Sequence, residues 1–156
     1  MKHLPLHLAF LVASMPALAQ DATPRDGWAI HPTDKPYAEL VQAVKSAVKA
    51  NGMAVVTEAG PTGAAASRGI TIPGNRVIGA FNNDFAVRIL ALSTSAMIEA
   101  PVRFYVTENE DGTATLSYKK PSFVFAPYVD EGGTTLTEIA AELDARFEAV
   151  ASSVNE

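Results

Sequence analysis

The chain has 156 residues, no cysteine and a formal net charge of −5 at neutral pH. The lack of cysteine excludes a thiol nucleophile, thiolate zinc sites, cysteine-bound iron–sulfur clusters and covalent c-type haem. Lysine and arginine are scattered, so no basic stripe is available to neutralise nucleic-acid phosphates or to dock on an anionic membrane. We therefore expect neither a nucleic-acid partner nor a cofactor or bound metal.

The first nineteen residues have the composition of a secretory signal peptide. Lys2 and His3 provide a positive start, a mostly apolar run follows over residues 4–13, and Ala17-Leu18-Ala19 is the small-x-small pattern that a signal peptidase reads. The pattern predicts cleavage near Ala19 and a periplasmic or secreted protein that begins at Gln20.

A membrane anchor is the alternative interpretation of the same segment. Spanning a bilayer takes about 20 apolar residues, and this run is shorter and is interrupted by Pro5 and His7. A lipoprotein-type anchor would need a cysteine after the cleavage site. We therefore expect no stable membrane anchor.

Removal of residues 1–19 leaves 137 residues with 11 basic and 17 acidic side chains, a net charge of −6. This length suits one domain with one core. We expect a flexible tether over residues 20–27 and a single domain over residues 28–154. His31 is then the one remaining histidine, and a lone histidine in a strand is more often a packing residue than a catalytic one.

Hydrophobic periodicity predicts alternating strands and amphipathic helices along the domain. In chain order, the predicted elements are a strand over 28–33 at a sheet edge, a helix from Pro36 to Asn51-Gly52, a buried strand over 53–57, a loop over 59–75 with one helical turn at 64–66, a strand over 76–81, a helix from Asn82 to about Met97, a hairpin of strands 102–107 and 113–118, an irregular segment over 122–133, and a helix that begins with a capping box at Thr135 and Glu138.

This order predicts an α+β fold. The hairpin requires an at least partly antiparallel sheet, and three amphipathic helices need one face of that sheet to bury their apolar stripes. We expect a two-layer sandwich with a mixed, largely antiparallel sheet of about five strands and about three helices on one face.

Three stretches, together with the Asp111-Gly112 turn and the segment 116–121, resemble one known family. The stretches are 43–58 with Asn-Gly-Met-Ala-Val-Val, 77–83 with Val-Ile-Gly-Ala-Phe-Asn-Asn, and 99–106 with Glu-Ala-Pro-Val-Arg-Phe-Tyr-Val. Over residues 28–150 the chain resembles the small domain called "domain of unknown function 302". The resemblance implies helices packed on a mixed sheet, frequent dimerisation, and no established reaction.

The chain departs from this family at three polar positions. Members often have Asn-Pro where this chain has Asn82-Asn83, and Asn-Asp-Pro where it has Lys119-Lys120-Pro121. A histidine common after the second strand is missing between Glu58 and Ala66. If these positions form a family site, Asn83 and Lys120 mark where this chain has changed it.

A first group of candidate ligand-binding residues follows the third predicted strand. Asn82, Asn83 and Asp84 offer polar side chains at a strand end, and Arg88 follows Asp84 by one helical turn. The competing interpretation is structural: asparagine is a favoured helix cap, and an i,i+4 pair of Asp84 with Arg88 is worth a few tenths of a kcal/mol.

Further candidates are carboxylates and tyrosines. Glu99 lies at a position where the family has an acid, and Glu58 is a partner for acid–base chemistry only if the fold brings the two together. Tyr105 and Tyr118 are expected to meet across the hairpin and stack a ligand, or else to serve a core or interface role. The acidic hairpin tip, with Glu110 and Asp111, lacks the spacing of a calcium loop.

We therefore expect a non-enzymatic ligand-binding or accessory protein. A small apolar or amphipathic ligand would bind between helices and sheet or at a dimer seam. The alternative is a small hydrolase or isomerase that uses Glu58 and Glu99. A homodimer is expected through the uncovered sheet face with Arg103, Tyr105 and Thr107, or with the alternate side chains of this strand if those form the uncovered face. Aromatic residues at 123, 125 and 128 would join this surface unless they fold back onto their own core.

Overall fold

The structure of the protein, a computed structural model, describes residues 23–154. The predicted signal peptide lies outside the described residues. No helix within the described range is long and apolar enough to cross a membrane.

The described elements follow the predicted order closely. They are β1 (Trp28–Pro36), α1 (Tyr37–Ala50), β2 (Ala54–Ala59), α2 (Thr62–Ala66), β3 (Asn75–Phe81), α3 (Asn83–Leu92), the 3₁₀ helix η1 (Ser95–Glu99), β4 (Val102–Glu108), β5 (Thr113–Lys119), α4 (Pro121–Phe125), the 3₁₀ helix η2 (Ala126–Tyr128) and α5 (Val129–Ser153).

The five strands form one sheet in the order β1-β5-β4-β3-β2. Every neighbouring pair in this sheet is antiparallel. β1 lies at one edge, as the proline near its end predicts. The α+β sandwich expected from the sequence is confirmed, with a sheet that is antiparallel throughout its described strands.

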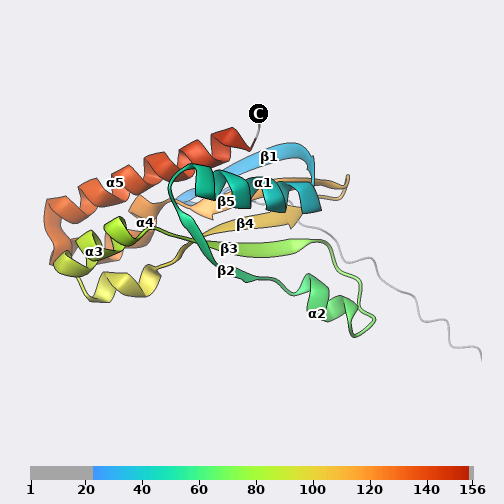
Figure 1. The fold of residues 1–156 in the computed structure, drawn as a ribbon, viewed down its shortest axis with the longest axis horizontal. Coiled ribbons are helices and arrows are strands. Elements are labelled where there is room, and N and C mark those ends of the chain that lie inside the picture. Colours follow the sequence, from blue (N-terminus) through green and yellow to red (C-terminus); the bar gives the residue numbers. More distant parts are fainter. Residues whose placement is uncertain (1–22, 155–156) are drawn as a thin grey trace, which may run out of the picture.

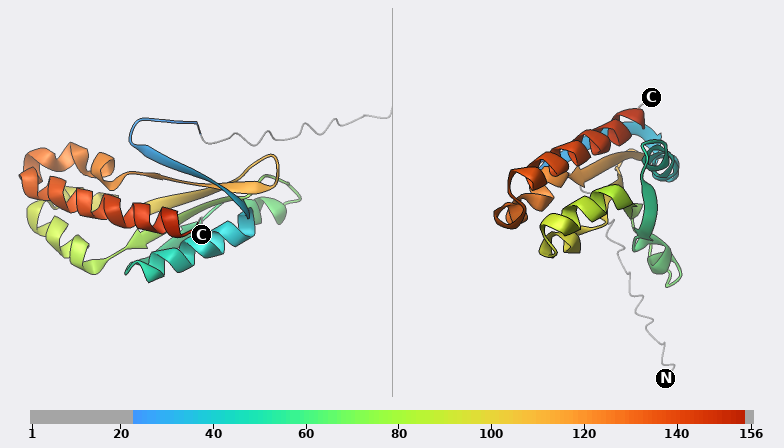
Figure 2. Two further views of the ribbon diagram at one scale, coloured as in Figure 1. Left: turned by 90° about the horizontal axis from the view of Figure 1, so that it is seen from above. Right: turned by 60° about the vertical axis from the view of Figure 1, so that its left-hand side comes forward.

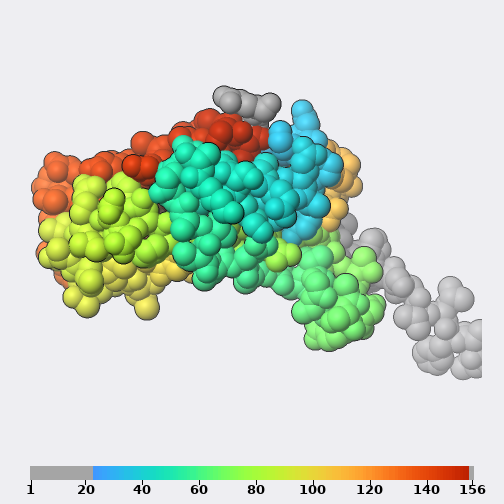
Figure 3. Space-filling model, viewed as in Figure 1, coloured from blue at the N-terminus to red at the C-terminus, as the bar shows by residue number. Residues whose placement is uncertain are grey.

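Helices α1, α3 and α5 cover one face of the sheet (Figures 1 and 2). Each presents an apolar stripe to the strands. In α1 the stripe consists of Leu40, Val41, Val44 and Val48, which are all buried. Because side chains alternate along a strand, the residues of β4 that meet these helices are Val102, Phe104 and Val106, and the intervening residues face the other way. Figure 3 shows α1, α3 and α5 side by side over the helical side of the molecule, with α2 projecting at one end.

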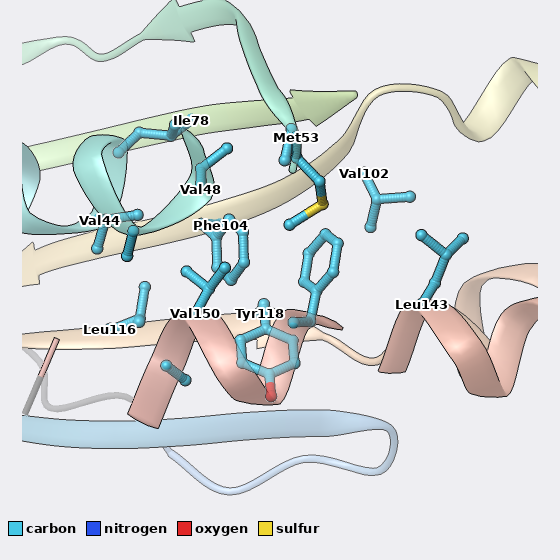
Figure 4. Close-up of a cluster of buried hydrophobic side chains, with 14 of the residues drawn as sticks. Val44, Val48, Met53, Ile78, Val102, Phe104, Leu116, Tyr118, Leu143 and Val150 are labelled. Carbon is cyan, nitrogen blue, oxygen red and sulfur yellow. The ribbon is translucent and has the colours of Figure 1, made fainter. Parts of the chain in front are cut away.

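The centre of the core is a cluster of aromatic rings between β4, β5 and α5 (Figure 4). Phe104 of β4 stacks on Phe147 of α5 with ring centroids 4.3 Å apart. Tyr118 of β5 meets both rings edge-on, at centroid distances of 5.4 Å. This cluster holds α5 across β4 and β5, the two strands of the hairpin.

Three predicted elements differ from the structure. The strand predicted as buried, β2, is the outer strand and is mostly exposed, because its buried neighbour β3 separates it from the centre. The predicted helix from Asn82 to Met97 stops at Leu92, and η1 follows. Ser93 has extended backbone angles at the end of α3, and its hydroxyl donates to Glu131 and accepts from the backbone N–H of Ala96. These hydrogen bonds hold the chain in the turn between α3 and η1.

The segment predicted as irregular is helical. It contains α4, η2 and the start of α5, which begins at Val129 rather than at Thr135. α5 is interrupted at Gly133, whose φ of 60° and ψ of −157° are accessible to glycine alone among the common residues. The long regular part of the predicted helix follows this interruption.

The aromatic residues of this segment mostly fold back onto the protein's own core. Phe125 is buried, and Tyr128 is half-buried against the core. Phe123 remains 47% exposed and lies against Gly27, where an added Cβ would come within 2.1 Å of its ring. A continuous aromatic contact surface over these three residues is therefore wrong, because two of them are used inside the domain.

The aromatic cluster supplies a direct test of the fold. We expect Phe147→Ala to lower the free energy of unfolding by about 3–5 kcal/mol, because it removes a fully buried ring and leaves a cavity beside Phe104. Urea denaturation followed by circular dichroism measures this change. The matched control is Val87→Ala on the outer side of α3, where the side chain is 58% exposed and the expected change is within about 0.5 kcal/mol. Equal effects of the two substitutions would contradict the described core.

Candidate functional site

Asn82 is the N-cap of α3. Its side-chain oxygen accepts from the backbone N–H groups of Asp84 (2.9 Å) and Phe85 (3.2 Å), and its amide donates to the carbonyl of Gly52 (2.8 Å). The structural interpretation of this asparagine is confirmed. Asn83 is the exposed first residue of α3.

Arg88 does not form its predicted pair with Asp84. Its guanidinium instead makes two hydrogen bonds, of 2.7 and 2.8 Å, to the carboxylate of Glu142 on α5. This pairing raises the pKa of Arg88 and lowers the pKa of Glu142. The fold places α5 alongside α3, so a charge distant in sequence provides a better bidentate partner than the local one.

Glu58 and Glu99 belong to separate clusters. The Glu58 carboxylate lies 2.8 Å from Lys45 Nζ and 3.3 Å from Arg76, and the hydrogen bond to Lys45 is the main reason that its pKa is lowered. Glu99 accepts a 2.8 Å hydrogen bond from the hydroxyl of Tyr128. A general acid needs a raised pKa, so this arrangement gives no support to an acid–base pair of these two residues.

Tyr105 and Tyr118 lie on opposite faces of the sheet. Tyr105 pairs with Ser117 across the hairpin, and Tyr118 pairs with Phe104. Tyr118 is 2% exposed within the core, and its hydroxyl donates to Glu148 on α5 (2.9 Å). Burial, followed by this contact, raises the pKa of Tyr118 far above its usual range. The two rings therefore point to opposite faces and do not meet, and Tyr118 has the core role that was the other interpretation.

His31 also serves the core side of the sheet. Its ring stacks on Tyr118 with a centroid distance of 5.7 Å and an interplanar angle of 9°. Its Nε2 atom lies 3.8 Å from the Glu148 carboxylate. The packing role expected of a lone strand histidine agrees with this position.

A cavity between α3, α5 and the sheet, bordered by Phe85, Phe147 and Val102, has a volume of about 30 Å³. This is roughly the volume of one water molecule, so this cavity is too small for a ligand. Within the described part of the chain, no group of three or more histidine, cysteine or acidic side chains is arranged to hold a metal ion.

The other face of the sheet is not covered by α1, α3 or α5. The register of the strands arranges its side chains in three rows that run across β1, β5, β4 and β3. The first row is Pro32, Thr115, Thr107 and Asn75; the second is Ile30, Ser117, Tyr105 and Val77; the third is Trp28, Lys119, Arg103 and Gly79. Apolar and aromatic residues thus occupy the middle of this face, and cations lie together in the third row.

A groove of about 570 Å³ lies over the second and third rows, and we call it the aromatic groove. Its volume is in the range of small-molecule sites. Three aromatic residues line it, together with two cations and four other residues of the strands and α4: Trp28, Tyr105, Tyr118, Arg103, Lys119, Asn75, Val77, Val102 and Val124. The amide of Asn75 donates to the hydroxyl of Tyr105 and so holds this ring in place.

The cations of the aromatic groove have no acidic partner among the described residues. Arg103 and Lys119 are exposed neighbours, one position beyond the Phe104–Tyr118 pair of the hairpin. The ion pairs in the described part of the chain involve other residues. Arg25 lies 5.9 Å over the ring of Trp28 and adds a third positive charge nearby. In a chain of net charge −5, this end of the groove is locally positive.

Ser117 lies in the middle row between Ile30 and Tyr105. Its residue is fully buried, and its hydroxyl has no hydrogen-bond partner among the described residues. A buried hydroxyl without a partner costs about 1–3 kcal/mol. The uncovered face therefore contains a buried hydroxyl without a hydrogen-bond partner, on the strand next to Tyr105.

A second hollow of about 840 Å³ lies at the opposite end of the same face, beside the hairpin tip. Three carboxylates, Asp34, Glu110 and Asp111, and one cation, Lys35, line it, so this hollow is acidic on balance. Asp111 accepts hydrogen bonds from the backbone and side chain of Thr113, which lower its pKa and close the turn. The uncovered face is thus positive at one end and negative at the other.

Of the residues predicted for a ligand site, two border the aromatic groove: Tyr105, and Tyr118, whose ring is otherwise buried in the core. Trp28, Arg103 and Lys119 were not predicted as their companions in ligand binding. The alternation of residues 28–32 and of the hairpin strands does put each of them on one side of its own strand. These residues come together because β1 pairs with β5, and no short-range sequence pattern predicts that pairing.

These features define a class of protein: a small α+β sandwich with one helix-covered sheet face and one uncovered, grooved face. The family described as "Domain of unknown function DUF302" matches residues 30–154 by its sequence model. The chain belongs to this family.

A solved structure agrees with this assignment. The chain is similar to the uncharacterized conserved protein DUF302 from Bacillus stearothermophilus, with a TM-score of 0.72 and 19% sequence identity over 83% of this chain and 98% of that one. This similarity concerns the fold. No curated protein matches the chain.

The Glu58 cluster predicts a pH dependence of stability. Because the folded pKa of Glu58 lies below its ordinary value of 4.5, its contribution is fully present above that value and is lost as pH falls through the folded pKa. We expect Glu58→Gln to destabilise the domain by about 1 kcal/mol at pH 7, with the difference from the unsubstituted protein shrinking below pH 4.5. Urea denaturation between pH 7 and 3 measures it. Glu138→Gln, at an exposed position of α5, is the control, and a difference that stays constant to pH 3 would contradict the role of Glu58.

Proposed function

We propose that this protein is an exported binding domain without catalytic activity, which holds a small amphipathic molecule in the aromatic groove. The observation that carries the proposal is that Trp28 and Tyr105 line one groove on an uncovered sheet face, with a volume suited to a small molecule. Aromatic rings provide large apolar contact area with a polar edge. They are therefore suited to a ligand that is partly apolar and partly polar.

The other candidate side chains form structural contacts, and this supports a binding role over catalysis. Glu58, Arg88 and Glu99 each have a structural partner on a neighbouring element. Enzymes arrange such groups together in one cleft with perturbed pKa values. In the aromatic groove the polar groups are instead an amide, a phenol and two cations, which suit recognition.

Export is proposed from the amino-terminal sequence. Residues 1–19 combine a positive start, an apolar run and a small-x-small cleavage pattern. The absence of cysteine is compatible with an oxidising compartment, because no disulfide is needed and no thiol is at risk.

Native mass spectrometry of the protein purified from the exported fraction tests both parts of this proposal. We expect a mature chain that begins at Gln20 and carries a bound small molecule. Tyr105→Ala should reduce ligand occupancy about tenfold or more, because it removes one aromatic wall of the groove. Leu90→Ala, a half-exposed position on α3, is the control. An intact Met1 would contradict export, and occupancy that is equal in both variants would contradict the groove.

We also propose that two copies associate through the uncovered face. The half-buried ring of Tyr105 in the middle row supports this arrangement, because a two-fold axis along that row would bring the Tyr105 side chains of the two copies into one interface. Tyrosine and arginine are favoured in interfaces. The aromatic groove would then be enclosed at the seam between the copies.

Sedimentation equilibrium at tens of micromolar tests this association. We expect a dimer that Tyr105→Ala weakens about tenfold or more, because it removes an aromatic contact from the middle of the uncovered face. Leu90→Ala truncates a half-exposed side chain on α3 and should leave the dimer intact. A monomer in the unsubstituted protein, or equal effects of the two variants, would contradict the proposed interface.

A further inference from the structure

We infer that the aromatic groove selects a carboxylate: the acid group lies between Arg103 and Lys119, and an apolar body extends along Trp28 and Tyr105. This inference rests on the proposed binding function and specifies the chemical class of the ligand. It follows from the placement of charge within the groove.

The two cations of the aromatic groove differ from the other cations in their pairing. In the described part of the chain, Arg76 and Lys45 meet Glu58, and Arg88 meets Glu142. Arg103 and Lys119 lie next to each other on the uncovered face and have no such partner. Two adjacent like charges repel one another, so the pair is stabilised by an anion that contacts both.

The lining of the groove determines which kind of anion fits it. The planar guanidinium of arginine matches the two oxygens of a carboxylate, and lysine adds a further donor as a compact charge. The rest of the groove is apolar or aromatic, with Trp28, Tyr105 and Val77 along it. A carboxylate with an aromatic or aliphatic body satisfies both parts, whereas an anion that is polar all round would leave the aromatic walls without a partner.

The charges along the uncovered face orient the ligand in the groove. The acidic residues Asp34, Glu110 and Asp111 lie at the other end of the same face. They would repel the acid group of a ligand bound the other way round. The charge separation along the face therefore fixes one orientation, with the acid group in the row of Trp28, Lys119 and Arg103 and the body over the row of Tyr105.

Three probes of one shape and different charge test this selectivity by isothermal titration calorimetry at pH 7 and low salt. They are naphthalene-2-carboxylate, the neutral naphthalene-2-methanol and the cationic naphthalen-2-ylmethylammonium. We expect the carboxylate to bind about 10–100-fold more tightly than the alcohol, since hydrogen bonds to charged groups are the strong ones. The ammonium probe should bind most weakly.

Variants assign the selectivity to the two cations. Arg103→Gln and Lys119→Gln should each lower the affinity for the carboxylate about tenfold or more and leave the affinity for the alcohol within twofold. Lys49→Gln removes the same charge at the end of α1 and should change neither. Circular dichroism verifies that each variant is folded, and the comparison of probes on the unsubstituted protein needs no variant.

The outcomes separate this inference from the proposed function. Equal binding of the acid and the alcohol by the unsubstituted protein overturns the inference and leaves the groove as a binding site. Equal effects of Arg103→Gln and Lys49→Gln overturn it as well, because the preference would then reflect overall charge. Binding of none of the three probes overturns the proposed groove itself.

Discussion

The packing of α5 against the hairpin of β4 and β5 determines the two faces of this domain. Phe104 and Tyr118 point inward because their rings meet Phe147 of α5. Side chains alternate along a strand, so fixing these two residues inward places Arg103, Tyr105, Ser117 and Lys119 outward. A slip of the hairpin by one residue would bury the cations and expose the core. Core packing and the composition of the aromatic groove are therefore two results of one register.

The distribution of charge follows from the same arrangement. Most acidic side chains of this acidic chain lie on helices or on the hairpin tip, and several of them are paired with neighbouring cations. The uncovered face receives two cations at one end and carboxylates at the other. A protein with negative net charge can thus present a local surface that attracts an anion, because short-range charge outweighs distant charge when salt screens the latter.

Most of the polar side chains predicted for a functional site instead hold helices and strands together. Asn82 caps α3, Arg88 joins α3 to α5, and Glu99 accepts from Tyr128. Each fixes one element against another at the rim of the core. The uncovered face differs, because the Ser117 hydroxyl and two cations there have no partner among the described residues. This division of roles is the basis for the proposed binding function.

The sequence by itself determined the local elements and the fold class, because helix stripes such as Leu40 to Val48 and the alternation over residues 102–107 are short-range signals of burial. It also determined the family. Tertiary structure alone decided which strands are neighbours, and so brought Trp28 beside Lys119 and Arg103, and paired Arg88 with Glu142 rather than with Asp84. These contacts join residues up to 91 positions apart. No local pattern encodes them, because they depend on the order of strands and on helix positions that the whole core fixes together.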